Sequence, residues 1–279
     1  MMSSVGDASH VIAIDYRGFG DSSSAIPTEK SLKVDSLTAY DWIVAQGVDP
    51  SKIVLVGHSL GTGVASGLAY HLTQKGMAFG GLVLLSAYAS IADAAIGYPM
   101  IPLLLPFRGW SWTEKMIRGV LIDKWNSTEC IRSLKCPILI IHGKRDFEIL
   151  PWQAKALFLE AVGGRMGESL VSSDGYWELR NKASKYSISE LSGVQVTPLA
   201  PDEGELWSSD ITKNVSGRTA VVSNDIWFLQ VTHGGHNTLS KFQVVQDCIN
   251  EWVENALTGS SANRNAFVAS KQSPPRKKA

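Results

Sequence analysis

The chain has 279 residues, of which 44% are hydrophobic and 19% are charged, so it holds enough apolar material for one large domain with its own core. Lys plus Arg and Asp plus Glu both total 26, so the formal net charge is zero. This balance argues against a nucleic-acid-binding protein, because such a domain concentrates basic residues on one face. The three cysteines have no C-x-x-C spacing, so neither a disulfide framework nor a zinc site is indicated.

The sequence predicts no signal peptide and no membrane-spanning segment. Residues 1–10 are small and polar, unlike a signal peptide. The longest weakly charged stretch, 76–107, is interrupted by Asp93 and by Gly, Ser and Pro residues, so it does not predict a transmembrane helix. Residues 258–279 are poor in apolar residues and contain the basic cluster Arg276-Lys277-Lys278, which predicts a disordered basic tail.

Short apolar runs bounded by turn residues predict strands that are buried on both faces. In chain order, these runs occupy 10–15, 52–57, 81–86, 137–142 and 226–231. Apolar residues at helical spacing predict helices from about 34 to 47, directly after Ser59, over about 154–161, and from about 242 to 257. The alternation predicts an α/β fold with a mainly parallel sheet and helices on both faces. Ligands of such sheets bind at the carboxyl ends of the strands.

We expect a single domain over residues 10–257, and two segments interrupt its alternation of strands and helices. Residues 88–129 are rich in Pro, Ile, Leu and Trp. Residues 163–225 form a long polar insertion with scattered aromatic residues, to which the sequence pattern assigns no structure.

The segment Gly57-His-Ser-Leu-Gly61 matches the motif G-x-S-x-G and lies between a predicted strand and a predicted helix, as the motif requires. The sharp turn holds the serine in a strained conformation, which larger residues at the glycine positions would obstruct. The N–H of Leu60, at the start of the helix, points toward the place where an oxyanion would form. Ser59 is therefore the candidate nucleophile and the Leu60 N–H a candidate oxyanion donor. The alternative is that Ser59 is a small turn residue without chemistry.

A serine hydroxyl needs an imidazole to take its proton. The segment Thr232-His-Gly-Gly-His-Asn237 lies between the last predicted strand and the last predicted helix, where the order Ser, Asp, His places the base. We favour His236 over His233, because His236 is nearer to the following helix. The other histidines are expected to be structural or exposed, with His58 pointing away from the serine oxygen and His142 supporting a turn; they are His10, His58, His71 and His142.

The acid of such a site is expected after the predicted strand that ends at His142. There, Gly143-Lys-Arg-Asp146 places a carboxylate in a tight turn. Asp146 would accept the imidazole N–H, fix its tautomer and stabilise the cation that forms during the reaction. Glu148 and Asp123 are weaker candidates, and a role of Asp146 as turn former or helix cap is the non-catalytic alternative.

These motifs together resemble the α/β-hydrolase superfamily. Within it, the chain is similar to the branch of monoacylglycerol and lysophosphatidylserine lipases (α/β-hydrolase domain protein twelve-like), over about residues 10–160 and 226–257. The resemblance implies a serine hydrolase without a cofactor that cleaves acyl esters of monoglycerides or lysophospholipids, commonly at the endoplasmic reticulum or another internal membrane. The motifs that carry it are Asp15-Tyr-Arg-Gly-Phe-Gly-Asp-Ser22, Asp41-Trp42, Gly57-His-Ser-Leu-Gly-Thr-Gly63, His142-Gly-Lys-Arg-Asp146 and Gly235-His-Asn237.

The resemblance also implies features around this core. The family carries a His-Gly-Asn segment after an earlier strand, which supplies a second oxyanion donor. Here only residues 1–9 precede the first predicted strand, so we expect that segment and an N-terminal membrane anchor to be missing. The usual first strands are also expected to be missing: a central strand that normally lies between the first two strands predicted here, and two more at the edge. Residues 88–129 lie where the superfamily places a cap over the pocket. Their apolar and Trp residues suit an acyl chain or a membrane surface, and packing onto the sheet is the alternative.

The expected function is hydrolysis of a small-molecule acyl ester or lipid, with a membrane surface as a further partner. Two alternatives stay open. The same mechanism could act on peptides or thioesters. The chain could also be a non-catalytic, truncated relative, because the second oxyanion segment and a central strand are missing.

Overall fold

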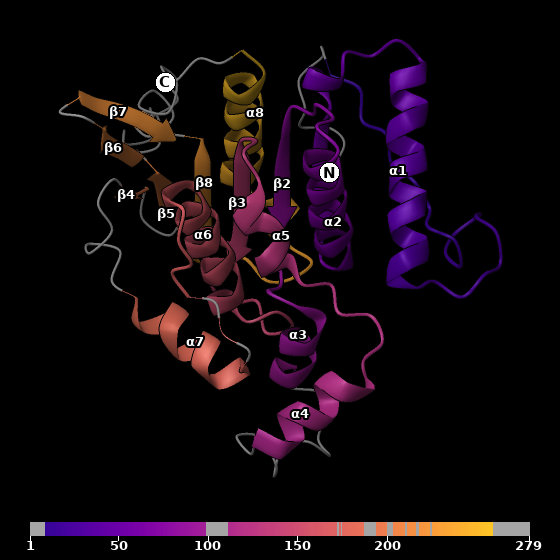
Figure 1. Ribbon diagram of the computed structural model, residues 1–279, viewed down its shortest axis with the longest axis horizontal. Helices are drawn as coiled ribbons and strands as arrows, with labels where there is room; N and C mark the ends of the chain where they lie inside the picture. The colour runs from indigo at the N-terminus through magenta and orange to yellow at the C-terminus, as the bar shows by residue number, and fades with distance from the viewer. Residues whose placement is uncertain are drawn as a thin grey trace, which may run out of the picture.

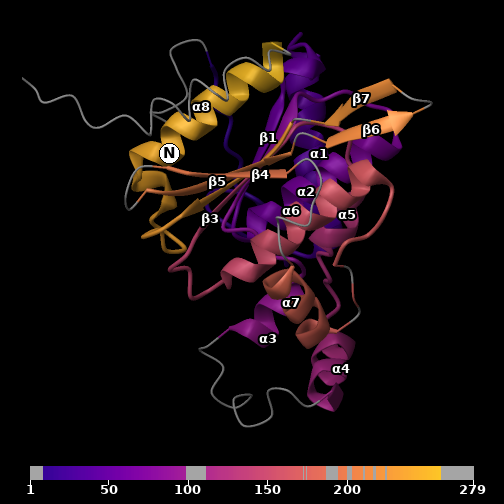
Figure 2. The same ribbon diagram turned by 90° about the vertical axis from the view of Figure 1, so that its left-hand side faces the viewer.

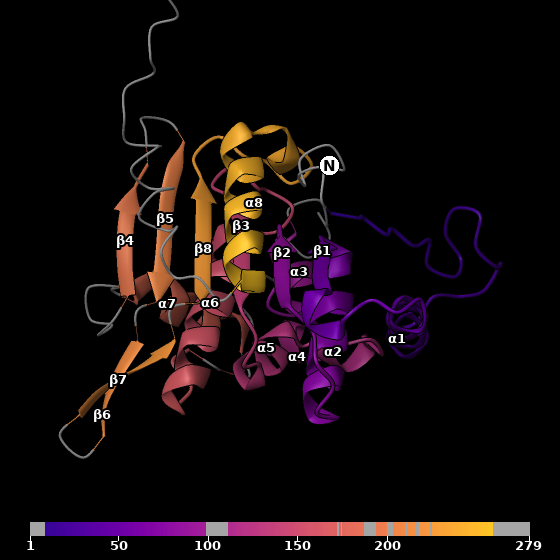
Figure 3. The ribbon, with the colours of Figure 1, turned by 90° about the horizontal axis from the view of Figure 1, so that it is seen from above.

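The structure, a computed structural model, describes residues 9–98, 111–171, 173, 175–186, 194–199, 203–209, 211–215, 218–223 and 225–258. Its centre is a sheet of six strands in the order β1-β2-β3-β8-β5-β4, which Figure 3 shows side by side. The strands are β1 (Val54–His58), β2 (Gly81–Leu85), β3 (Ile138–Gly143), β8 (Ile226–Val231), β5 (Gly204–Ser209) and β4 (Val194–Pro198).

Helices cover both faces of this sheet. One face carries α8 and the other carries α1, α2, α5 and α6, whereas α3, α4 and α7 gather at one end of the molecule (Figures 1 and 2). The helices are α1 (Glu29–Ala45), α2 (Leu60–Gln74), α3 (Ile91–Gly97), α4 (Ser111–Val120), α5 (Ser127–Ser133), α6 (Pro151–Met166), α7 (Tyr176–Lys185), α8 (Gln243–Thr258) and the short 3-10 turns η2 (Pro50–Lys52) and η5 (Leu239–Lys241).

The parallel part of the sheet confirms the α/β prediction. β1, β2, β3 and β8 pair in parallel in that order, and each corresponds to one of the predicted apolar runs. Their carboxyl ends therefore meet at one edge of the sheet. The predicted helices also form, as α1, α2, α6 and α8.

The prediction of a buried strand over 10–15 is wrong. This segment forms no strand, and Val11, Ile12 and Ile14 are 47%, 49% and 40% exposed. An apolar run becomes a strand only where a neighbouring chain accepts and donates its backbone hydrogen bonds. In the part of the chain that the structure describes, no strand pairs with this segment. β1 forms the edge of the sheet, and its Val56 is 55% exposed.

The predicted polar insertion, 163–225, is not a simple excursion from the core. After the end of α6 it contains α7, then β4 and β5, which extend the sheet beyond β8 in antiparallel pairing. A separate hairpin follows, formed by β6 (Ile211–Val215) and β7 (Arg218–Ser223). In β5, Leu206 and Trp207 are both buried, 1% and 6% exposed. Neighbouring residues of a strand point to opposite faces, so this polar-looking segment contributes to both sides of the core.

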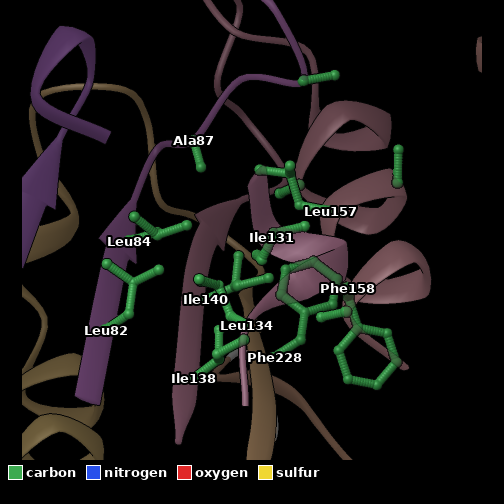
Figure 4. Close-up of a cluster of buried hydrophobic side chains, with 14 of the residues drawn as sticks. Leu82, Leu84, Ala87, Ile131, Leu134, Ile138, Ile140, Leu157, Phe158 and Phe228 are labelled. Atoms are coloured by element: carbon green, nitrogen blue, oxygen red, sulfur yellow. The ribbon is translucent and has the colours of Figure 1, made fainter. Parts of the chain in front are cut away.

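Two apolar layers hold the strand ends in place. On one face, side chains of β2 and β3 meet those of α5 and α6 (Figure 4). On the other, alternate residues of the same strands meet α8 through Val245, Cys248 and Trp252. Burial of both faces fixes the register of the parallel strands, because a slip of one residue would exchange the two layers. The residues labelled in Figure 4 are Leu82, Leu84, Ala87, Ile131, Leu134, Ile138, Ile140, Leu157, Phe158 and Phe228.

No helix in the described residues is both long and apolar enough to cross a lipid bilayer. The expected disordered tail lies, apart from Thr258 at the end of α8, outside the described residues. So do residues 99–110 of the segment predicted as a cap.

Candidate active site

Ser59 lies in a sharp turn between the end of β1 and the start of α2. Its backbone has φ 52° and ψ −120°, a strained conformation for a residue other than glycine. The N–H of Ser59 donates to the Leu85 carbonyl at 3.1 Å, and Thr62 Oγ1 donates to the Ser59 carbonyl at 2.7 Å. A side chain at Gly57 would collide with the Gly61 carbonyl, so the turn requires glycine there. The strained serine and the close approach at Gly57 agree with the motif, whereas a side chain at Gly61 would meet only the Tyr16 hydroxyl at 3.7 Å, so the expected obstruction there is wrong.

The structure brings Ser59, His236 and Asp146 together, although they follow three different strands, β1, β8 and β3. The Ser59 Oγ lies 2.8 Å from His236 Nε2, and His236 Nδ1 lies 2.9 Å from Asp146 Oδ2. Asp146 is 1% exposed and His236 is 8% exposed, whereas Ser59 is half-buried. A reactant can therefore approach the hydroxyl, while the other two groups are shielded from water.

The carboxylate of Asp146 is held by its own turn. Its Oδ1 accepts hydrogen bonds from the N–H groups of Glu148 at 3.0 Å and Ile149 at 2.9 Å, which leaves Oδ2 for the imidazole. The turn also packs against the loop of His236, since the Arg145 N–H donates to the Gly234 carbonyl at 3.1 Å. The turn of Asp146 and the loop of His236, far apart in the sequence, are thus fixed to each other beside Ser59.

The contacts between Asp146 and His236 shift the pKa values of both side chains. Burial by itself would raise the pKa of Asp146, but the hydrogen bond with His236 and the donors of its turn hold that pKa below its ordinary value. Burial by itself would lower the pKa of His236. The hydrogen bond and negative charge of Asp146, together with the charge of Glu148, outweigh this effect of burial and raise the pKa of His236. The arrangement therefore favours an ionised carboxylate next to a histidine that readily accepts a proton.

The backbone carbonyl of His236 accepts two hydrogen bonds that the sequence motifs do not reveal. His58 Nε2 lies 3.0 Å from this oxygen and the Ser86 Oγ lies 3.2 Å from it. Because the acceptor is a carbonyl, His58 must carry its proton on Nε2. His58 does not simply pack away from the site, as the sequence suggested. It contacts the segment that carries the favoured base.

The other histidines and carboxylates considered as base or acid have other surroundings. His233 is exposed, and Asp123 Oδ1 accepts from the Glu29 N–H at the start of α1, at 2.9 Å. His142 supports the turn after β3, as expected, because its Nε2 donates to the Ile149 carbonyl at 2.9 Å. Glu148 does approach the site: its Oε2 is 4.0 Å from His236 Nε2 and its side chain is 47% exposed.

The Leu60 N–H is the first amide of α2, immediately after Ser59. In the described part of the chain it has no hydrogen-bond acceptor, as is usual for the first amides of a helix. The next turn is held by Tyr88, whose hydroxyl donates to the Leu60 carbonyl at 3.3 Å. The amide is thus available to an anion beside the serine. Within the described residues, no group of three or more His, Cys, Asp or Glu side chains is arranged to hold a metal ion.

A mainly parallel sheet with a strained serine on a strand-to-helix turn, facing a histidine from a later strand, defines an α/β hydrolase. The sequence matches the model of the alpha/beta hydrolase family over residues 3–177. The chain belongs to this family.

The chain is also similar to individual proteins. The human protein ABHD12B is 37% identical over 140 residues, covering 49% of this chain and 37% of that protein. The lysophosphatidylserine lipase ABHD12 of Danio rerio is 34% identical over 146 residues, covering 52% of this chain and 37% of that protein. An acylaminoacyl peptidase structure from Pyrococcus horikoshii aligns with TM-score 0.47 and 11% identity, over 84% of this chain and 30% of that one. The chain thus spans well under half the length of the two curated relatives.

Proposed function

We propose that the chain is a serine hydrolase of carboxylic esters that works through an acyl-enzyme. Ser59 is the nucleophile, His236 the general base and Asp146 the residue that orients the imidazole and stabilises its cation. The Leu60 N–H is an oxyanion donor. The single observation that carries the proposal is the 2.8 Å contact between Ser59 Oγ and His236 Nε2, in a histidine whose other nitrogen faces Asp146.

The chemistry follows from these positions. His236 Nε2 takes the proton of Ser59 as Oγ attacks the ester carbonyl, and the carbonyl oxygen becomes an anion beside the Leu60 amide. When the tetrahedral species collapses, the imidazolium gives its proton to the leaving alcohol and an acyl-serine remains. A water molecule, deprotonated by the same nitrogen, then releases the acid. The low pKa of Asp146 keeps its carboxylate ionised through these steps.

Covalent labelling tests this assignment directly. A fluorophosphonate should label the protein at Ser59, and the label should be lost in Ser59→Ala. Ester hydrolysis by that variant should fall by roughly 10⁴-fold or more. Ser24→Ala, which changes an exposed serine outside the candidate site, should label as the wild type does. A folded wild-type protein that takes up no label, or a Ser59→Ala variant that keeps its activity, would contradict the proposal.

For the substrate we propose an acyl ester of a monoacylglycerol or lysophospholipid. The relatives described as lysophosphatidylserine lipases support this choice. A panel with a shared acyl chain tests it: a monoacylglycerol, a lysophosphatidylserine, an acyl-thioester and an aminoacyl-amide. The two glycerol-based esters should have the highest kcat/KM. Preference for the thioester or the amide would assign the same catalytic groups to another reaction.

We further propose that α4 forms part of a cap that contacts a lipid surface. Trp112, Met116 and Val120 recur at intervals of four residues along this helix and are 50%, 46% and 75% exposed, and Ile122 just beyond is 92% exposed. Residues four apart share one face of a helix, so these side chains form a continuous apolar stripe. Such a stripe gains free energy when it enters the boundary between lipid headgroups and acyl chains.

Vesicle flotation tests this surface. Wild-type protein should float with phosphatidylcholine–phosphatidylserine vesicles, and a Trp112→Ala/Met116→Ala double variant should bind them about tenfold more weakly or worse. Trp42→Ala on α1 is the matched control, because Trp42 is 55% exposed and lies on another helix. Equal flotation of the double variant and the wild type would rule out the stripe as the contact.

A further inference from the structure

Glu148 places a second carboxylate beside the imidazole of the candidate site. Its Oε2 lies 4.0 Å from His236 Nε2, the nitrogen that faces Ser59, and its side chain is 47% exposed. Glu148 takes no part in the proton transfers of the proposed mechanism. A charge this close to the reacting atoms nevertheless acts on the part of a substrate that lies beside them.

Two hydrogen bonds hold Glu148 in this position. Its backbone N–H donates to Asp146 Oδ1 at 3.0 Å, and its side-chain Oε1 accepts from Asn237 Nδ2 at 3.3 Å. Asn237 directly follows His236, so the loop that carries the base also orients this carboxylate. The bond to Asn237 uses Oε1 and leaves Oε2 as the oxygen nearer to the imidazole.

The negative charge of Glu148 is not balanced by a basic side chain. Among the described residues, no lysine or arginine lies within ion-pair distance of its carboxylate, and Lys144 of the same turn pairs with Glu205 at 3.1 Å. The charge of Glu148 is one of the causes that raise the pKa of His236, so its field reaches the imidazole. Asp146 also flanks this imidazole but is buried, which leaves Glu148 as the carboxylate that a substrate meets.

The leaving alcohol of an ester must come close to this carboxylate. His236 Nε2 gives its proton to the leaving oxygen, so that oxygen lies within hydrogen-bond reach of Nε2, about 3 Å. A charged group two or three bonds beyond the oxygen can come within about 8 Å of the Glu148 carboxylate, which is the Debye length at physiological salt. Salt therefore screens the interaction between the two charges only partly.

We propose that Glu148 selects esters by the charge of their leaving alcohol. It favours an alcohol that is neutral or carries a cation, and it disfavours an alcohol that carries an anion. This inference rests on the proposed ester hydrolysis and deepens it, because it names the kind of alcohol that the site accepts. Of the two glycerol-based esters in the substrate panel, the monoacylglycerol has a neutral alcohol and the lysophosphatidylserine has one with a net negative charge. Glu148 therefore ranks the monoacylglycerol first.

Three butyrate esters of similar size test this selection. Butyrylcholine carries a quaternary ammonium, 3,3-dimethylbutyl butyrate a neutral tert-butyl group and 2-sulfoethyl butyrate a sulfonate. Relative to the neutral ester, Glu148→Gln should lower kcat/KM for the choline ester about fivefold and raise it for the sulfonate ester about fivefold. Glu148→Lys should change both ratios further in the same directions. Comparison of each variant with the wild type cancels the intrinsic reactivities of the three esters.

The same ratios separate charge selection from an effect on the base. Replacement of Glu148 also alters the pKa of His236, but this change acts equally on all three esters and cancels when their kcat/KM values are divided. Salt at 1 M shortens the Debye length to about 3 Å, so it should move the wild-type ratios toward those of Glu148→Gln. Glu168→Gln, which removes another exposed glutamate, is the matched control and should keep the wild-type ratios.

Unchanged ratios in Glu148→Gln and Glu148→Lys, or an equal change in Glu168→Gln, would overturn the proposal. Failure of this inference can be told apart from failure of the proposed function. If a fluorophosphonate labels Ser59 and the esters are cleaved with unchanged ratios, only the charge selection by Glu148 is wrong. If the folded protein takes up no label at Ser59 and cleaves none of the three esters, the proposed function is wrong and this inference falls with it.

Discussion

The ring of His58 holds the backbone of His236, with Nε2 of His58 3.0 Å from the His236 carbonyl oxygen. The two rings lie 5.4 Å apart between centroids and are tilted by 42°. His58 immediately precedes Ser59, so one strand end carries both the nucleophile and a group that positions its partner. The buried Ser86 adds a second hydrogen bond to the same carbonyl from the end of β2.

His58 is therefore expected to act as a positioning residue. His58→Leu should lower kcat and the rate of fluorophosphonate labelling about fivefold, because a hydrogen bond of this kind contributes about 1 kcal/mol. His58→Gln, whose amide N–H reaches toward the same carbonyl, should keep most of the wild-type rate. KM should be unchanged in both variants. Equal rates for the Leu and Gln variants would show that the hydrogen bond does not matter.

The pH dependence of the reaction should report the raised pKa of His236. The base must be neutral to take a proton, so kcat/KM should rise with pH and reach half its maximum above 6.5, the ordinary value for histidine. Glu148→Gln removes one of the charges that raise this pKa, so the midpoint should move to lower pH. Glu168→Gln, at an exposed position away from the site, should leave it in place. A Glu148→Gln midpoint that moves upward or stays would show that the carboxylate does not act on His236.

Gly143 sets the distance between the turn of Asp146 and the loop of His236. A Cβ atom at this position would collide with the Gly234 backbone. Gly143→Ala should push the loop away, lengthen the contact between His236 and Asp146, and lower kcat by at least about tenfold. Gly119→Ala in α4 is the control, because nothing lies near its Cβ position and alanine favours a helix. Wild-type labelling kinetics in Gly143→Ala would contradict the tight packing of these two loops.

Replacement of Trp207 tests whether the antiparallel strand β5 contributes to the hydrophobic core. Its ring packs edge-on against Phe158 at 5.8 Å and Phe228 at 5.0 Å between centroids. Trp207→Ala should lower the free energy of unfolding by about 3–5 kcal/mol, measured by urea denaturation. Trp42→Ala, at an exposed position, should change it by about 0.5 kcal/mol or less. Similar small effects of both substitutions would mean that β5 contributes little to stability.

Much of this architecture could be predicted from local sequence. The runs that became β2, β3 and β8 are continuous and apolar because both of their faces are buried, a pattern that needs no tertiary information. The turn at Ser59 is encoded in part by Gly57, which has no room for a side chain. The order in which Ser59, Asp146 and His236 follow their strands was also sufficient to nominate all three.

Where the local sequence is ambiguous, tertiary structure decided which segments form strands. Val11, Ile12 and Ile14 have the composition of a strand, but in the described residues no neighbour is present to pair with them, and they are exposed. Conversely, β5 contains Glu205 and Ser208 and looks polar, yet β8 supplies the hydrogen-bonding edge that makes it a strand. Pairing is a property of two segments, so neither segment alone encodes it.

The sequence by itself determined the residue types and the chain order of the candidate site, because a strained turn and buried parallel strands leave strong local patterns. Only the tertiary structure decided which further groups meet them. The contact of His58 with the His236 carbonyl and the approach of Glu148 to its ring join residues 178 and 88 positions apart. Such contacts depend on how loops fold over the edge of the sheet, and no local pattern of residues encodes which distant side chains the loops bring together.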